Sequence, residues 1–107
     1  MLASFSVVPM TTGESVSHLV AESLKIVDAS GLDYQLGPMQ TIVEGEEAKV
    51  METIMKCHRR LLELAPRVLT TITIDDRKGA TGRLRGKVRD VEQRVGKTLQ
   101  RVAGESK

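Results

Sequence analysis

A run of short hydroxyl side chains that ends in a carboxylate is the part of the sequence best suited to chemistry. It lies in the segment RVLTTITIDDR at 67–77, where Thr71, Thr73 and Asp75 share one face of an expected β-strand, because successive strand residues point to opposite faces. Small hydroxyls leave room above a sheet and offer donors and acceptors, so this hydroxyl face is a candidate for binding a polar ligand. Threonine is also a good strand former, and a purely structural strand would show the same pattern.

The elements around this strand follow from the periodicity of the apolar residues. Alternating and helical spacings predict, in chain order, strand 2–10, helix 16–30, strands 32–36 and 39–44, helix 46–65, strand 67–77 and helix 84–102. The order β-α-β-β-α-β is that of the ferredoxin-like plait, an α+β fold with a four-stranded antiparallel sheet and both inner helices on one face. We expect residues 1–103 to form one domain that includes the added C-terminal helix, and residues 104–107 to be a disordered tail.

The second face of the predicted sheet has no inner helix to cover it. Besides the hydroxyl face, it would carry the following residues of the first and third strands: Ser4, Ser6, Val8, Gln40, Ile42 and Glu44. The more apolar Met39, Thr41 and Val43 would then face the helices. A half-apolar sheet face and bare edge strands need cover, which the last helix or a second copy of the chain would supply. We therefore expect a homo-oligomer.

Composition argues against several classes of protein. The 107 residues suit one domain with a packed core, and a formal net charge of +2 does not by itself indicate a polyanionic partner. Phe5 and Tyr34 are the only aromatic residues, which argues against a stacking platform for single-stranded nucleic acid. Cys57 is the only cysteine, so no internal disulfide can form, and the cytoplasm is the expected location. We expect neither a signal peptide nor a membrane span.

Motifs that suggest reactive sites lack the required geometry. Cys57 and His58 are neighbours on an expected helix and point about 100° apart, so they would not converge on a metal ion or form a nucleophile–base pair. The glycine-rich turn at 79–82 lacks the spacing and the Gly-Lys-Ser/Thr ending of a Walker phosphate loop. Asp75 and Asp76 would point to opposite faces of the strand, which gives acid–base catalysis weak support. We expect no metal site and no enzyme activity.

The predicted C-terminal helix is strongly basic. Its cationic residues are Arg83, Arg85, Lys87, Arg89, Arg94, Lys97 and Arg101. Such a helix could bind nucleic acid or an anionic membrane surface. Asp90 and Glu92 dilute the charge and bulky membrane anchors are missing, so a solvated outer face is the preferred interpretation.

Three segments, in their order and spacing, resemble a known family. They are VVPMTTGESVS at 7–17, GLDYQLGPMQTIVEG at 31–45 and RVLTTITIDDR at 67–77. As a set they resemble the small thiamine-binding protein family, long catalogued as an uncharacterised protein family. The resemblance runs from the first strand to about Asp90.

The resemblance implies a ferredoxin-like plait that assembles into dimers and then tetramers, and it implies no catalysis. Thiamine or its hydroxymethyl-aminopyrimidine part would be held near a subunit interface, as a ligand and not as a cofactor. The residues carried over as candidates for ligand binding are Ser6, Thr11, Met39, Thr41, Glu44, Thr71, Thr73 and Asp75. Gln40 departs from the small residue, often glycine, that the family has between Met39 and Thr41, and its longer side chain would narrow a pocket.

The chemistry of thiamine is compatible with these residue types. A carboxylate such as Asp75 or Glu44 can offset the positive thiazolium, and threonine hydroxyls can pair with the aminopyrimidine edge. Scarce aromatic residues predict a modest affinity. We therefore expect a protein that binds thiamine for sensing, storage or delivery. The alternatives are a structural or regulatory homo-oligomer without this ligand, nucleic-acid binding through the basic helix and, with least support, an enzyme acting on a thiamine-like heterocycle.

Overall fold

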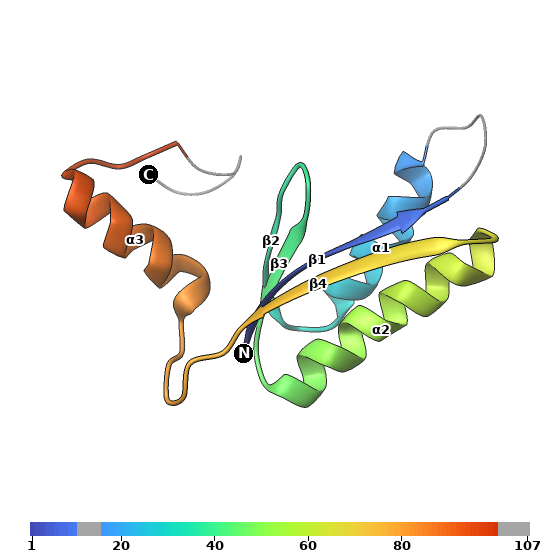
Figure 1. Cartoon of the computed structure of the whole chain (residues 1–107), viewed down its shortest axis with the longest axis horizontal. Helices are drawn as coiled ribbons and strands as arrows, with labels where there is room; N and C mark the ends of the chain where they lie inside the picture. Colours follow the sequence, from blue (N-terminus) through green and yellow to red (C-terminus); the bar gives the residue numbers. More distant parts are fainter. Residues whose placement is uncertain (11–15, 101–107) are drawn as a thin grey trace.

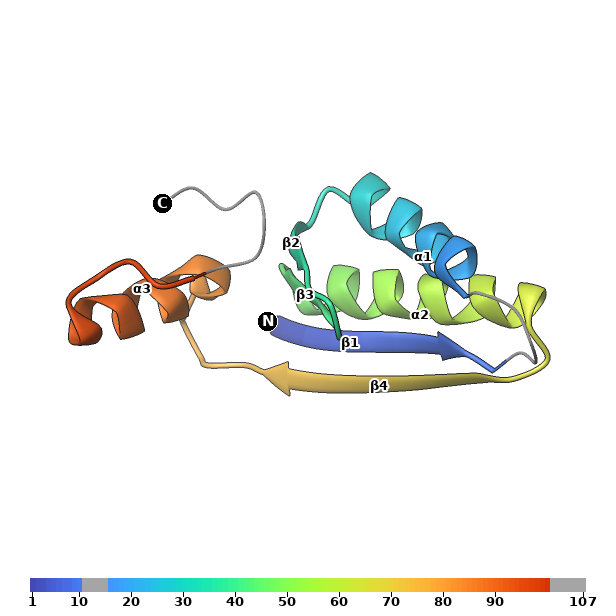
Figure 2. The same cartoon turned by 90° about the horizontal axis from the view of Figure 1, so that it is seen from above.

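Residues 1–10 and 16–100, which the computed structural model describes, form a four-stranded antiparallel sheet and three helices. The elements are β1 (Leu2–Pro9), α1 (Ser17–Ala29), β2 (Asp33–Leu36), β3 (Thr41–Glu44), α2 (Glu47–Leu64), β4 (Val68–Asp75) and α3 (Arg83–Val95). The strands lie in the order β2-β3-β1-β4 (Figure 1). Figure 2 shows α1 and α2 on the same side of the sheet. This arrangement confirms the predicted ferredoxin-like plait with an added helix.

The core lies between the sheet and the apolar stripes of α1 and α2. On α2, Val50, Ile54, Cys57 and Leu61 recur at helical spacing and are fully buried. They belong to the same buried cluster as Phe5 of β1. Burying each aliphatic side chain contributes about 1.5–3 kcal/mol, so this stripe holds α2 on the sheet.

The register of the strands assigns each side chain to one of two faces. Phe5 and its β3 partner Thr41 are buried on the face that the helices cover. Ser4 pairs with Ile42 and with Thr73, and this row lies on the open face. The register therefore confirms that the hydroxyl face of β4 and the alternate side chains of β3 share the open face.

Three carboxylates line up across the open face at the end of the sheet where β1 begins. Leu2 pairs with Glu44 of β3 and with Asp75 of β4, and Glu44 pairs in turn with Asp33 of β2. Neighbouring strands lie about 4.8 Å apart, so these residues form one continuous row across the sheet. We call Asp33, Glu44 and Asp75 the acid row.

The first turn of α3 is held by the central carboxylate of the acid row. Glu44 accepts hydrogen bonds from the backbone N–H groups of Arg83, at 2.8 Å, and of Leu84, at 3.1 Å. A helix leaves its first N–H groups without partners and carries a partial positive charge at this end, so the carboxylate satisfies both requirements. The Leu84 side chain is only 4% exposed and anchors the turn.

Ion pairs to the outer members of the acid row flank this attachment. Arg85 lies 2.9 Å from Asp33, and the Lys87 ammonium donates a hydrogen bond to Asp75. All four side chains are about half exposed, so each pair contributes about 0–1 kcal/mol. The helix is thus directed by these pairs but held mainly by Glu44 and Leu84, and it lies beyond the end of the sheet, apart from α1 and α2 (Figure 2).

The C-terminal helix ends earlier than the sequence pattern predicts. It ends at Val95 because Gly96 adopts a left-handed conformation, with φ at 88°, and donates its N–H to the Glu92 carbonyl oxygen at 2.7 Å. The Glu92 carboxylate then accepts a hydrogen bond from the N–H of Leu99 at 2.5 Å, which bends the next residues toward the helix. The prediction of a helix through residue 102 is therefore wrong for residues 96–100. Residues 101 and 102 and the predicted tail at 104–107 lie outside the described residues.

Removing the Glu44 carboxylate should loosen α3. Glu44→Ala leaves the N–H groups of Arg83 and Leu84 without their acceptor, and the loss of a helix cap costs about 0.5–2 kcal/mol. We expect this decrease in the free energy of unfolding in urea, together with faster amide hydrogen exchange in the first turn of α3. Glu46→Ala removes a nearby exposed carboxylate and is the matched control. Unchanged exchange in α3 of the Glu44 variant would contradict the assignment.

The thiol of Cys57 should be nearly inert in the native protein. Its Sγ is buried and donates to the carbonyl oxygen of Ser23 at 3.4 Å, and burial raises the pKa of the thiol to about 11. The thiolate is the reactive form, and a rise of two pKa units lowers its fraction about 100-fold. We expect labelling by a disulfide reagent at pH 8 to be slower by at least about this factor than in urea. Equal rates in the two conditions would show that the α1–α2 interface opens freely.

Candidate functional site

A groove of about 340 Å³ lies between α3 and the open face of the sheet. Its floor is the row beside the acid row, formed across the four strands by Gln35, Ile42, Ser4 and Thr73. Leu84, Lys87 and Val88 of α3 form the wall. The volume falls at the lower end of the roughly 300–1,000 Å³ that is usual for small-molecule sites.

The lining of the groove combines apolar side chains with short polar ones. Ile42 of the floor faces Leu84 and other apolar residues of the wall, while Ser4 and Thr73 contribute hydroxyl groups. Gln40, which is larger than the residue expected at its position, contributes a side-chain amide. A small planar heterocycle can therefore find apolar contacts for its faces and hydrogen-bond partners for its edge.

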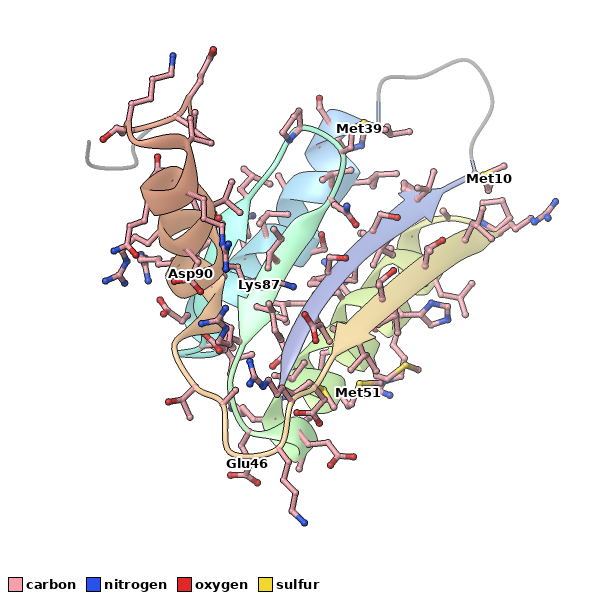
Figure 3. The ribbon with its side chains drawn as sticks, turned by 60° about the vertical axis from the view of Figure 1, so that its left-hand side comes forward. Met10, Met39, Glu46, Met51, Lys87 and Asp90 are labelled. Atoms are coloured by element: carbon pink, nitrogen blue, oxygen red, sulfur yellow. The ribbon has the colours of Figure 1, made fainter. Side chains whose placement is uncertain are left out.

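Asp75 is the member of the acid row that lines the groove. The hydrogen bond from Lys87, and then the positive charges of Lys87, Arg83 and Arg77, hold the pKa of the Asp75 carboxyl below its usual value. The carboxyl is therefore ionised at neutral pH. Its side chain is 54% exposed, which leaves it accessible to a ligand. Figure 3 shows Lys87 on the side of α3 that faces the strands.

A smaller cavity of about 130 Å³ adjoins the groove at the acid row. Asp75, Arg83 and Lys87 line both spaces, and the smaller one adds Asp76 and Arg77. Charged side chains therefore predominate around this cavity, whereas the larger groove adds hydroxyls, amides and apolar side chains to the three shared charges. A ligand that spans the two spaces would meet a different chemistry in each.

The structure brings together three of the residues that the sequence analysis nominates for ligand binding. Thr73 and Asp75 line the groove. Glu44 lies two strands from Asp75 in the acid row, with Leu2 between them, and its carboxylate is engaged by the first turn of α3. Ser6 and Thr71 pair with each other in the next row of the open face, outside the groove.

The other nominated residues lie away from the groove. The prediction that Met39 belongs to a strand and faces the helices is wrong, because β3 begins at Thr41. Met39 lies in the connection between β2 and β3 and is 87% exposed (Figure 3). Thr41 is 6% exposed and faces the helices. Both line a third cavity of about 170 Å³, to which Ser6 also contributes. Thr11 lies outside the described residues.

The sequence pattern does not predict the helical wall of the groove. The sequence places the wall residues only on a basic helix with one apolar stripe; these residues are Leu84, Lys87 and Val88. Leu84 and Val88 are four residues apart, which does place them on one side of the helix. The strands that Leu84 and Val88 face depend on how the acid row holds α3. The residues of this row come from three strands and line up only in the folded sheet.

The arrangement is suited to binding. Within residues 1–10 and 16–100, no three His, Cys, Asp or Glu side chains gather as a metal ion would require. No helix in the described part of the chain is long and apolar enough to cross a membrane. What the groove offers is an accessible carboxylate, hydroxyls and amides in a partly apolar setting.

Comparison with known proteins identifies relatives along most of the chain. The family model described as Thiamine-binding protein matches residues 3–92. A UPF0045 protein of Mycobacterium bovis is 37% identical over 94 residues, which cover 87% of this chain and 92% of that protein. A UPF0045 protein of Staphylococcus xylosus is 39% identical over 93 residues, which cover 81% of this chain and 87% of that protein.

Solved structures have the same fold. A Methanocaldococcus jannaschii protein matches with a TM-score of 0.80 and 24% identity over 86% of this chain and 95% of its own, a likeness that concerns the fold alone. A Thermotoga maritima protein described as a candidate for thiamine biosynthesis or salvage matches with a TM-score of 0.73 and 26% identity, over 84% of this chain and 96% of its own. Because the family match spans most of the sequence, and relatives above 30% identity match over most of their length, this chain belongs to the thiamine-binding protein family.

Proposed function

We propose that the protein binds thiamine or its hydroxymethyl-aminopyrimidine part, without catalysis, in the groove between α3 and the open face. The observation that carries the proposal is an ionised, accessible carboxylate, Asp75, beside the hydroxyl groups of Ser4 and Thr73 in a space of about 340 Å³. Membership of the thiamine-binding family supports this class of ligand, as does the connection of the Thermotoga maritima relative with thiamine. Such binding would serve the sensing, storage or delivery of thiamine.

Each part of thiamine has a counterpart in the groove. The thiazolium ring carries a fixed positive charge, which the Asp75 carboxylate can offset. The aminopyrimidine edge presents both donors and acceptors, for which Ser4, Thr73 and Gln40 offer partners. Ile42 and the apolar residues of α3 supply contacts for the ring faces. No aromatic side chain occurs among the described residues that line the groove, so we expect a modest affinity.

A second copy of the chain would complete the cover of the open face. The groove reaches Ser4 and Thr73, whereas the next row, Ser6 and Thr71, lies outside it. In the row beyond, Val8 and its partner Leu69 are 42% and 54% exposed. Clustered exposed apolar side chains are typical of interaction surfaces. We extend the proposal to a homo-oligomer, a dimer and then a tetramer, in which the groove lies near a subunit interface.

The pairing of the basic residues argues against nucleic-acid binding through α3. Three of its cations already pair with carboxylates of this chain: Arg83 with Asp90, Arg85 with Asp33, and Lys87 with Asp75. Binding to a phosphate backbone gains its free energy from charges that neutralise phosphates and release their counterions. Cations that must first leave an intramolecular partner gain less in this way.

Replacing Asp75 should weaken the binding of thiamine but not that of its uncharged aminopyrimidine fragment. In calorimetric titration we expect saturable binding of both thiamine and the hydroxymethyl-aminopyrimidine fragment by the unaltered protein. Asp75→Asn removes the partner of the thiazolium, and loss of a half-exposed charge contact should weaken thiamine binding about fivefold. Binding of the uncharged fragment should change little. Asp76→Asn is the matched control, because Asp76 follows Asp75 in the chain but does not line the groove.

Replacing Thr73 should instead weaken the binding of both thiamine and the fragment. Thr73→Val keeps the shape of the side chain but removes its hydroxyl, and a lost hydrogen bond to a neutral partner weakens binding by roughly three- to tenfold. The matched control is Thr71→Val, which makes the same change on the same face of β4, one row outside the groove.

Three results would count against the proposed function. Absence of saturable heat from both ligands at millimolar concentration, with the fold intact, would favour a structural or regulatory oligomer. Equal losses from Thr71→Val and Thr73→Val would move the site away from the groove. Turnover of the fragment would establish an enzyme.

A further inference from the structure

Lys87 differs from the other cations at the start of α3 in its choice of partner. Arg83 and Arg85 pair with Asp90 and Asp33, and neither of these carboxylates lines the groove. Lys87 pairs with Asp75, which is the one carboxylate among the described residues that line the groove. The position that would receive a ligand's positive charge is therefore already occupied by a side chain of the same charge.

We infer that Lys87 sets the charge selectivity of the groove. A ligand with a bare cation must displace the ammonium group from Asp75, whereas a ligand that carries an anionic group besides its cation offers Lys87 a new partner. The inference rests on the proposed function and refines its ligand class to a cationic heterocycle that bears a phosphate.

Displacement of Lys87 is feasible because its ion pair is accessible to solvent and its side chain is flexible. The side chains of Lys87 and Asp75 are 51% and 54% exposed, and an exposed pair of this kind is weak. The ammonium is a compact charge on a flexible four-carbon stem, so it can move several ångströms while α3 stays in place. The first turn of α3 remains held by Glu44 and Leu84, which do not depend on Lys87.

Other charges near Asp75 do not remove the competition. Arg77 and Arg83 add positive charge around the carboxylate. Glu44 is engaged by backbone N–H groups, and Asp76 lies 3.8 Å from the amino group of Met1. An approaching cation therefore meets a site in which positive groups already satisfy the nearby carboxylates.

The adjoining cavity of about 130 Å³ offers a place for the anionic group. Arg77, Arg83 and Lys87 line it, and Asp75 connects it to the groove. The carboxylates of Glu44 and Asp76 also line it, but the first accepts hydrogen bonds from α3 and the second pairs with the amino group of Met1. A heterocycle in the groove with its cation at Asp75 would extend a phosphate ester into this cavity. There the displaced Lys87 ammonium could pair with the phosphate, so one ion pair would be exchanged for two.

Titration of wild-type protein and Lys87→Met with thiamine and with thiamine monophosphate tests the inference. Removal of the competitor should tighten thiamine binding about fivefold, and removal of the phosphate partner should weaken monophosphate binding by a similar factor. The preference for monophosphate over thiamine should thus fall by more than about tenfold. Lys78→Met removes the same charge from a residue that does not line the groove and should leave this preference unchanged.

The uncharged aminopyrimidine fragment reports on the integrity of the groove in the same variants. Because the fragment carries no charge to compete or pair with Lys87, Lys87→Met should change its affinity much less than that of either charged ligand. Equal weakening of the binding of all three ligands would show that Lys87 acts only by holding α3, and would overturn the inference. Tighter binding of thiamine than of monophosphate by wild-type protein would also overturn it. If wild-type protein bound none of the three ligands, the proposed function would fail together with the inference.

Discussion

The hydrogen bonds from the first turn of α3 to the Glu44 carboxylate are the interaction on which the rest of the site depends. They join the end of a central strand to a helix that is remote in sequence. A carboxylate is favoured at this place because the helix N-terminus presents unpaired N–H groups and a partial positive charge. Without this attachment the open face would have no wall, and the groove would be an uncovered sheet.

Because of this attachment, the three carboxylates of the acid row have different roles. Glu44 is committed to the helix backbone, and Asp33 pairs with Arg85 at the outer edge. Among the residues that the structure describes, Asp75 pairs only with the flexible ammonium group of Lys87, and it has access to the groove. The resemblance to the family nominates both Glu44 and Asp75 as ligand partners, but in this chain their surroundings differ: one carboxylate builds the wall and the other faces the space that the wall encloses.

Much of the fold could be predicted because its signals are local. Alternation gave the face of each strand, including the assignment of Ile42 and Glu44 to the open face, and helical spacing gave α1 and α2. The end of α3 could not be predicted in the same way, because Leu99 continues the apolar spacing beyond Gly96 while the glycine adopts a left-handed conformation. The groove was predicted only in part. Thr73 and Asp75 stand out on their own strand, but Lys87 becomes relevant only because docking of α3 brings it to Asp75, twelve residues earlier in the chain.

Charge complementarity within the chain accounts for the placement of the basic residues at the start of α3. The cations at the start of α3 face a row of carboxylates on the sheet, so most of their charge is used inside the molecule. The same complementarity orients the helix and leaves Asp75 and Lys87 together at the edge of the groove. An ion pair whose two side chains are both exposed is a weak structural contact. The pair of Asp75 and Lys87 nevertheless lies where a charged ligand would have to bind. In this protein the contacts that attach the helix, at Glu44 and Leu84, are therefore distinct from the neighbouring ion pair of Lys87 and Asp75 that would discriminate between ligands.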